Sequence, residues 1–225
     1  MSKADILEKL KQAIIEVDFE EVTRLLKEGL TAGVAPVEMI TKGLSPGLSI
    51  IGERYEKKEM FMSDLVMAGE IMNDAMGILR PVMEAGGQPL GDTMVIGTVE
   101  GDQHNIGKRI VAAMFTGAGY KVVDIGENMP ASEFVKVAKE IKATVVGASV
   151  ILGPLKPYCK VINDALINAG IRDKVIFIIG GWGMTQHWCD NAGADAFGDS
   201  AVDAVHKVKM IRAGELPKFK ERLGK

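Results

Sequence analysis

The sequence predicts an α/β protein in which an N-terminal helical bundle precedes a Rossmann- or flavodoxin-like, doubly wound parallel sheet of five strands. Three observations predict this fold. Apolar residues recur at helical spacing through residues 1–86, whereas short β-branched apolar runs alternate with helical segments from residue 92 onward. Glycine and proline punctuate the chain between the two halves. We therefore expect a helical domain at residues 1–86, a linker at residues 87–91 and an α/β domain at residues 92–225.

Helical periodicity divides the first domain into consecutive helices. Ser45 precedes Pro46, a pattern typical of an N-cap followed by proline at the first helical position. Ser63 is in turn expected to cap a long final helix. The apolar residues follow helical spacing within residues 6–17, 19–30, 37–44, 48–55 and 65–83.

Apolar runs in the second half are nearly continuous, as in strands that are buried on both faces. The alternation of such strands with helices predicts a parallel sheet that helices cover on both sides. Ligands of such sheets bind at the carboxyl ends of the strands. The expected strands are residues 94–99, 121–125, 144–151, 175–179 and 194–197, and the expected helices are residues 106–118, 132–141, 155–168 and 200–211.

The overall composition argues against several classes of partner. Hydrophobic residues make up 47% and charged residues 25% of the chain, which is ordinary for a globular protein. The formal net charge of −3 gives no reason to expect a nucleic-acid or membrane-surface partner. We find no cleavable leader and no apolar run of ~20 residues, and therefore expect a cytoplasmic protein. Cys159 and Cys189 form neither a disulfide framework nor a metal-ligand spacing.

The loop after the first expected strand carries the residues of chemical interest. It reads Gly101-Asp102-Gln103-His104-Asn105-Ile106-Gly107 and leads into a helix. It has neither the G-x-G-x-x-G pattern of dinucleotide sites nor the Gly-Lys-Ser/Thr of a P-loop. Imidazole is a good ligand for transition metals, and its second ring nitrogen needs an orienting acceptor. Asp102, two residues before His104, is placed to be that acceptor, directly or by setting the loop.

Two interpretations of His104 are open. One is a loop histidine that helps to cap the following helix. The other is a metal ligand, but a conventional zinc or iron site needs further protein ligands, and His187 and His206 lie far along the chain. One protein ligand suffices only if a macrocycle supplies the other coordination positions. A lone Asp-x-His therefore fits a tetrapyrrole-like cofactor better than a bare ion.

The same loop resembles the Asp-x-His-x-x-Gly signature of cobalamin-binding domains, with Asp102, His104 and Gly107 at the defined positions. Ser149-Val150-Ile151 stands where that family has Ser-x-Leu, and Gly180-Gly181 stands at the end of the fourth strand. The chain is thereby identified as a member of the corrinoid (cobalamin) proteins of multi-component methyltransferase systems. These are similar to the cobalamin module of methionine synthase.

The resemblance implies a bound cobalamin or related corrinoid in the base-off, His-on form, in which His104 replaces the cofactor's own base on cobalt. The cofactor tail would pass beside the sheet, where Gly180 and Gly181 allow a close approach. Ser149 would hydrogen-bond near that tail or support His104. The other residues of this half that the resemblance assigns to the cofactor are Asp102, Asn105, Ile106, Gly107 and Ile151.

The helical half is similar to the family's cap domain, in Gly52–Glu56 and Met60–Leu65. The resemblance implies that an apolar region of this cap covers the upper face of the corrin, which limits oxidation of cobalt(I) and loss of the methyl group. The alternative is that the same residues form part of the bundle core. They are Phe61, Met62, Val66 and Met67.

Several positions depart from the family pattern. Ile151 replaces the usual leucine, and Gly153-Pro154 stands where hydroxyl-bearing residues are common. Trp182 follows the glycine pair where a small residue is usual, and it would pack on the cofactor tail or close the pocket. Asn105 often has an acidic counterpart in the family. The Asp102–His104 pair itself matches the pattern.

The function that the resemblance implies is that of a non-catalytic methyl carrier. Such a carrier accepts a methyl group on cobalt(I) from a substrate-specific methyltransferase and delivers it to a second methyltransferase, which uses tetrahydrofolate or coenzyme M. A reductive activation protein would be a further partner. A helical cap and a cobalamin domain account for the length, which leaves no room for a catalytic barrel of ~250 residues.

Other functions are weighed against the carrier. A B12-dependent sensor has the same two domains but needs a DNA-binding module. We expect no such module, because residues 1–20 show neither a helix-turn-helix pattern nor a basic face. The small subunit of a B12 mutase lacks the helical cap, which residues 1–85 provide. A flavodoxin-like phosphate or nucleotide binder, with His104 incidental, would lack the visible bands of a corrinoid. The sequence does not identify the methyl donor.

Overall fold

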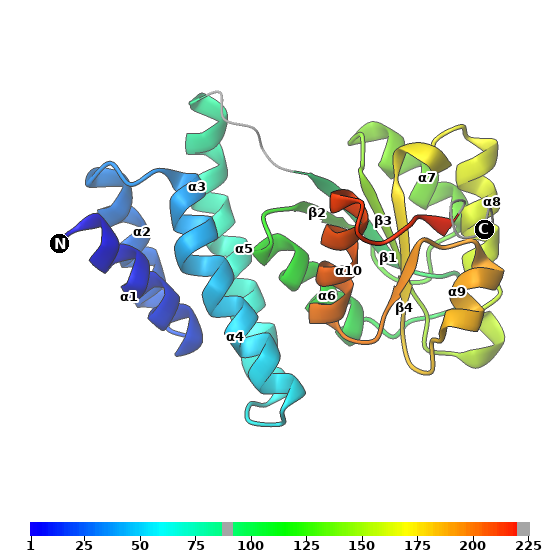
Figure 1. Cartoon of the computed structure of the whole chain (residues 1–225), viewed down its shortest axis with the longest axis horizontal. Coiled ribbons are helices and arrows are strands. Elements are labelled where there is room, and N and C mark those ends of the chain that lie inside the picture. The colour runs from blue at the N-terminus through cyan, green and yellow to red at the C-terminus, as the bar shows by residue number, and fades with distance from the viewer. Residues whose placement is uncertain (87–91, 220–225) are drawn as a thin grey trace. The chain divides into compact units, whose positions relative to one another are not determined.

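The computed structural model describes residues 1–86 and 92–219 (Figure 1). The predicted linker at residues 87–91 lies outside the described residues. The described residues fall into two compact units: those up to residue 86 together with Ala113–Lys121, and Asp92–Ala112 together with Val122 onward. The domain limits of residues 1–86 and 92–225 stay a prediction.

The first unit is helical, as the periodicity predicts. Ile6, Leu10 and Ile14 of the first helix are fully buried, and so are Leu25 and Leu26 of the second, because these residues recur on one face. The helices are α1 Lys3–Ile15, α2 Phe19–Thr31, α3 Pro36–Glu38, the π-helix Met39–Leu44, α4 Ser45–Glu56 and α5 Met62–Ala85.

Two predicted helix caps in this unit are wrong. Ser45 has helical backbone angles, because the π-helix runs directly into α4 and leaves no free helix start to cap. Helix α5 begins at Met62, so Ser63 lies inside its first turn. The Phe61 amide donates instead to the Asp64 carboxylate at 2.9 Å, so Asp64 satisfies the exposed start of this helix.

The second unit contains a five-stranded sheet with strand order β2-β1-β3-β4-β5, in which β1, β3, β4 and β5 pair in parallel. This order is that of a flavodoxin-like, doubly wound sheet, and it confirms the predicted fold class. Each strand lies where an apolar run predicts one. The strands are β1 Thr93–Thr98, β2 Lys121–Asp124, β3 Val145–Ser149, β4 Ile176–Gly180 and β5 Ala196–Gly198.

Helices pack on both faces of the sheet (Figure 1). On one face, Val95, Val146 and Phe177 of the strands form a continuous apolar core with Phe134 of α7 and Ile162 of α8. Helix α10 packs against β5 and β4 on the other face. The helices that follow the strands are α6 Ile106–Gly117, α7 Ala131–Glu140, α8 Tyr158–Asn168, α9 Gln186–Ala192 and α10 Ala201–Ala213.

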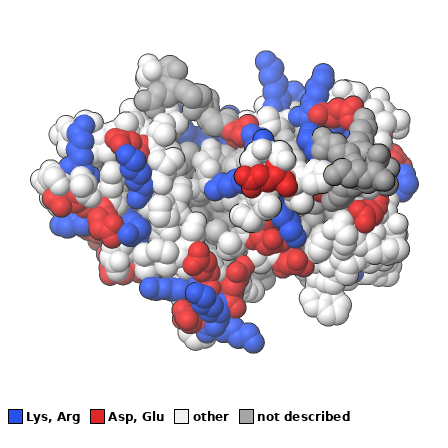
Figure 2. All heavy atoms as spheres, in the orientation of Figure 1, with Lys and Arg blue, Asp and Glu red and all other residues white. Residues whose placement is uncertain are grey.

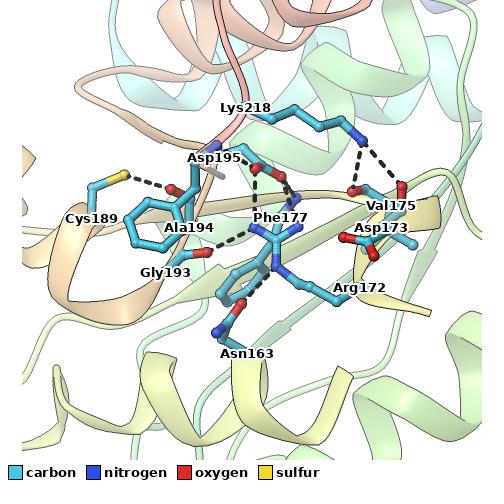
Figure 3. Close-up of polar contacts among 11 residues, drawn as sticks. Asn163, Arg172, Asp173, Val175, Phe177, Cys189, Gly193, Ala194, Asp195 and Lys218 are labelled. Carbon is cyan, nitrogen blue, oxygen red and sulfur yellow. Dashed lines mark hydrogen bonds and ion pairs between the residues drawn. The ribbon is translucent and has the colours of Figure 1, made fainter. Parts of the chain in front are cut away.

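A buried polar cluster closes the amino ends of β4 and β5 (Figure 3). The Arg172 guanidinium, 8% exposed, donates to both oxygens of Asp195 at 3.0 Å and to Asn163 Oδ1 at 2.6 Å. It also donates to the Gly193 carbonyl at 2.7 Å, while the Phe177 amide donates to Asp195 at 2.8 Å. Charge and hydrogen bonds are thus satisfied within this end of the sheet, which indicates a structural role.

Acidic and basic side chains are interspersed on the face that Figure 2 shows, so this face carries no large patch of one charge. Across residues 1–86 and 92–219, no helix is long and apolar enough to cross a membrane.

Candidate functional site

The carboxyl edge of the sheet is lined by small residues. Thr98, Ser149, Gly180 and Gly198 end β1, β3, β4 and β5 and stand opposite one another in register. Because side chains alternate along a strand, residues in register project from the same face of a parallel sheet. This row of small side chains therefore leaves room at the edge where α/β proteins bind their ligands.

The β1–α6 loop begins beside this row and turns sharply. Gly101 has φ +88°, a conformation that favours glycine, and the Asp102 amide donates to the Val99 carbonyl at 3.0 Å. The turn buries Asp102 completely, whereas the His104 side chain is 52% exposed. The loop thus presents the imidazole outward from a buried carboxylate.

The Asp102 carboxylate is saturated with hydrogen bonds. Its Oδ1 accepts the His104 amide at 2.9 Å and lies 2.7 Å from His104 Nδ1. Its Oδ2 accepts the amides of Ile151 and Leu152 at 2.6 and 3.2 Å. Asp102 therefore ties the β1–α6 loop to the β3–α8 loop and fixes the orientation of the imidazole.

These contacts also set the protonation of the pair. Burial acts to raise the pKa of Asp102, but the hydrogen bonds from the His104 and Ile151 amides, the His104 ring and the Leu152 amide together outweigh it, so this pKa lies below its usual value. An ionised carboxylate only accepts hydrogen bonds, so His104 Nδ1 carries the proton. In the neutral imidazole the lone pair then lies on Nε2, the nitrogen that a metal would use.

The donor set suits a metal that brings its own equatorial ligands. Within the described parts of the chain, no group of three His, Cys, Asp or Glu side chains could hold a bare ion. Both cysteines are buried and free, and burial raises the pKa of the Cys159 thiol to about 12, so this thiol is protonated at neutral pH. One oriented imidazole fits a macrocycle-bound metal.

Gly180 and Gly181, at the end of β4, differ in the space that a Cβ would find at each position. A Cβ on Gly181 would lie 1.8 Å from the Val150 carbonyl oxygen, and its φ is +129°, so the fold itself requires glycine there. A Cβ on Gly180 would meet only the Gly198 carbonyl oxygen, at 3.8 Å. Gly107 has nothing within 4 Å of such a Cβ. Gly180 and Gly107 thus border open space.

The structure places the other predicted residues of this half around the same loop. Asn105 precedes α6, and its side-chain amide donates to Glu127. Ile106 is 56% exposed. Ile151 contributes its backbone amide to Asp102. The Ser149 hydroxyl makes no hydrogen bond to any described residue, His104 included, and its contact with the cofactor tail stays a prediction.

The predicted apolar residues of the helical half lie in the other unit, around the start of α5. Phe61 is 80% exposed, Met62 42% and Met67 54%, while Val66 is half-buried. The alternative that they belong to the bundle core is therefore wrong for Phe61, Met62 and Met67, because the buried face of this turn carries Leu65 and Ala68 instead.

Sequence reasoning singled out Trp182 but missed Leu152 and Lys156, which shape the neighbouring loops. Leu152 supplies the second amide to Asp102 and is 41% exposed. Trp182 is 80% exposed and stands between two glycines with positive φ, Gly181 and Gly183. Lys156 donates to the Gly183 carbonyl at 2.6 Å and braces that turn. Only the two flanking glycines signal this turn in the sequence.

Family models identify the class of protein. The chain belongs to the B12-binding family, since two models, each described as a B12 binding domain, match residues 6–80 and 93–206. Together with the relatives below, this makes it a corrinoid protein of methyltransferase systems and confirms the resemblance seen in the sequence.

The chain resembles particular corrinoid proteins over nearly its whole length. It is 42% identical to trimethylamine corrinoid protein 1 of Methanosarcina acetivorans, over 93% of this chain and 98% of that protein. It is 37% identical to the dimethylamine corrinoid protein of Methanosarcina barkeri, over 95% of this chain and 100% of that protein. Its structure matches the methanol:cobalamin methyltransferase complex MtaBC of Methanosarcina barkeri with a TM-score of 0.83 and 26% identity, over 99% of this chain and 85% of that chain.

Proposed function

We propose that this chain is a non-catalytic methyl carrier that binds a corrinoid in the base-off, His-on form with His104 as its cobalt ligand. The observation that carries the proposal is the buried Asp102 carboxylate, which holds His104 Nδ1 at 2.7 Å and leaves Nε2 of a half-exposed ring for the metal. The corrinoid, when bound, supplies the cobalt on which the methyl group is carried.

Each protein group has a distinct part in this proposal. Asp102 orients the imidazole and, in the neutral ring, selects the tautomer that has its proton on Nδ1 and its lone pair on Nε2. Gly107 and Gly180 leave space for the macrocycle and its tail, because a Cβ at either position would meet no protein atom closer than 3.8 Å. Ile106, half-exposed beside His104, would give the corrin an apolar neighbour. Ser149 and Gly181 would border the tail, and the Asn105 and Ile151 contacts would hold the loop.

The cap residues would exclude water from the reactive face. Phe61, Met62 and Met67 are large, apolar and exposed around the start of α5, an arrangement that is costly unless a ligand or partner covers it. Val66 completes this apolar surface. We infer that they shield the bound cofactor, and that the chain itself performs no chemistry on the methyl donor.

The partners follow from the relatives. MtaBC is a methanol:cobalamin methyltransferase complex, and the more similar relatives are named as trimethylamine and dimethylamine corrinoid proteins. We therefore infer a substrate-specific methylamine methyltransferase as the donor partner. A second methyltransferase would pass the methyl group to coenzyme M or tetrahydrofolate, and a reductive activation protein would restore the cobalt(I) state.

Reconstitution with cobalamin tests the ligation. The wild-type protein should give the base-off, His-on spectrum, and His104→Ala should lose axial nitrogen ligation while still binding corrinoid. His206→Ala is the matched control, because His206 is also an exposed histidine of this unit but lies on α10. Unchanged ligation in His104→Ala would remove the proposal.

Methyl transfer tests the donor. The reconstituted protein should be methylated by a trimethylamine or dimethylamine methyltransferase in the presence of its amine, and not by a methanol methyltransferase in the presence of methanol. Equal methylation by the methanol enzyme would contradict the assignment of a methylamine donor, but would leave the ligation proposal intact.

A further inference from the structure

The β2–α7 loop grips the β1–α6 loop on both sides of His104. Before His104, the Gly101 amide donates to Asn128 Oδ1 at 2.7 Å, and the Asn128 amide donates to the Asp102 carbonyl at 2.9 Å. After His104, the Asn105 side chain donates to Glu127. None of these contacts involves the imidazole itself.

Asn128 is held in an unusual backbone conformation. Its φ is +55°, in the left-handed region that most residues avoid and that asparagine tolerates. Its amide also lies 2.9 Å from the Thr98 hydroxyl, which in turn donates to the Asp102 carbonyl at 2.7 Å. Thr98 is completely buried. The surroundings of Asn128 therefore fix both its backbone and the peptide that follows Asp102.

The base of this loop is anchored by a buried cation. Lys108 of α6 is 2% exposed and forms an ion pair with Asp124 at the end of β2. The same Asp124 oxygen accepts the Gly126 amide at 2.8 Å, and the Gly126 carbonyl accepts the Thr98 amide at 3.1 Å. The segment is thus held at both ends: Asp124 pairs with Lys108 of α6, and the Asn128 amide bonds to Thr98 of β1.

We propose that residues 124–128 form a clamp that positions His104, and that the Asn128 side chain is the positioning group through which it acts. The inference rests on the proposed function, since it concerns the same imidazole. Asn128 contacts the Gly101 amide and the Asp102 main-chain carbonyl but not the ring, so it sets the direction of Nε2 through the main chain that carries the buried carboxylate. It is an outer partner of the ligand, of the kind that tunes metal sites.

The clamp has a measurable consequence for ligation. If a corrinoid is bound, an imidazole that is held less firmly would be a weaker cobalt ligand, and it would stabilise cobalt(II) less against reduction. Loosening the clamp should therefore lower the fraction of His-ligated cobalt(II) and move the cobalt(II)/cobalt(I) midpoint potential to less negative values.

Asn128→Gly and Asn128→Asp form a matched pair for the test. Glycine keeps the left-handed backbone but removes the acceptor for the Gly101 amide. Aspartate keeps that acceptor, tolerates the same backbone, and places its charge at an exposed position where water screens it. Thr98→Val is a second variant, which removes the hydroxyl bonds to Asn128 and Asp102.

The measurement is made on full-length protein reconstituted with cobalamin. The electron paramagnetic resonance spectrum of the cobalt(II) state reports nitrogen ligation, redox titration gives the potential, and thermal unfolding checks the fold. We expect Asn128→Gly to lower the ratio of His-ligated to His-free cobalt(II) by about tenfold, with a less negative potential, and Asn128→Asp to match the wild type. Thr98→Val should shift both readouts in the same direction as Asn128→Gly.

Folded Asn128→Gly and Thr98→Val proteins with wild-type ligation and potential would overturn the clamp, as would an Asn128→Asp protein that behaves like Asn128→Gly. The failure of the proposed function has a different signature. In that case His104→Ala also leaves ligation unchanged, whereas a failed clamp alone leaves the effect of His104→Ala intact.

Discussion

Two buried carboxylates lie at opposite ends of the same sheet and serve different purposes. Asp102 at the carboxyl end is 0% exposed and Asp195 at the amino end is 1% exposed, and each accepts hydrogen bonds on both oxygens. Their cationic or ring partners differ. Arg172 is buried with Asp195, whereas His104 is 52% exposed beside Asp102. One pair is closed on itself, and the other leaves a ring nitrogen facing outward.

A structural polar cluster and a functional one differ in whether a donor atom is left unused. Both carboxylates need partners because burial of an unpaired charge is costly. At the amino end the guanidinium donates all these hydrogen bonds within the cluster, to Asp195, Asn163 and Gly193. At the carboxyl end the amides of Ile151 and Leu152 support the carboxylate, so the imidazole is oriented but not consumed. The unused donor atom, and not the burial, marks the site.

The largest expected effect is at the amino end. Arg172→Met should lower the free energy of unfolding by about 3–5 kcal/mol, because it leaves Asp195 buried without its cation. Urea unfolding of the apoprotein measures the loss. The double variant Arg172→Met/Asp195→Leu should recover most of it, since no unpaired charge remains. A loss below about 1 kcal/mol for the single variant would show that this end is not a closed ion pair.

The next largest effect is expected at the glycine pair, where Gly181 is needed for the fold and Gly180 is expected to border the cofactor. Gly181→Ala should destabilise the protein by about 1–3 kcal/mol through its backbone strain alone, with the overlap on Val150 in addition. Gly180→Ala should change stability by less than about 0.5 kcal/mol. If Gly180 borders the cofactor tail, only corrinoid affinity falls in that variant. Equal unfolding midpoints for the two variants would argue against this division.

Asp102→Asn should cost about 1–3 kcal/mol, because an amide group cannot accept all the bonds that the carboxylate accepts. The effect depends on pH. The pKa of Asp102 is lowered in the folded protein, so its contribution is present above the unfolded pKa of about 4 and is lost as pH falls through the folded value. Unfolding of the apoprotein between pH 7 and pH 3 should therefore show a shallower acid loss in Asp102→Asn. Parallel curves would contradict the ionised state of Asp102.

The fold was predictable because its signals are local. Strands that are buried on both faces have nearly continuous apolar sequences, and each expected strand overlaps an observed one. The limits were less accurate. The strand expected at residues 144–151 ends at Ser149, because the amides of Ile151 and Leu152 turn toward Asp102. The helix expected from residue 155 begins at Tyr158, after Pro157.

The site was predictable in its centre and not in its surroundings. Asp102 and His104 are two residues apart, so their contact follows from the loop itself. The contacts of Asn128 with Gly101 and of Lys108 with Asp124 join different loops, and they arise only when β1 and β2 lie side by side. No spacing rule in the sequence brings those residues together.

A small effect on stability and the largest effect on cobalt ligation are expected at His104. Because its ring is half-exposed, His104→Ala should change the free energy of unfolding by no more than about 0.5 kcal/mol. The electron paramagnetic resonance spectrum of the cobalt(II) form of the reconstituted protein tests the central claim most directly. Nitrogen hyperfine splitting from the His104 imidazole is expected in the wild type, and its loss is expected in His104→Ala. The same splitting in both proteins would contradict the claim.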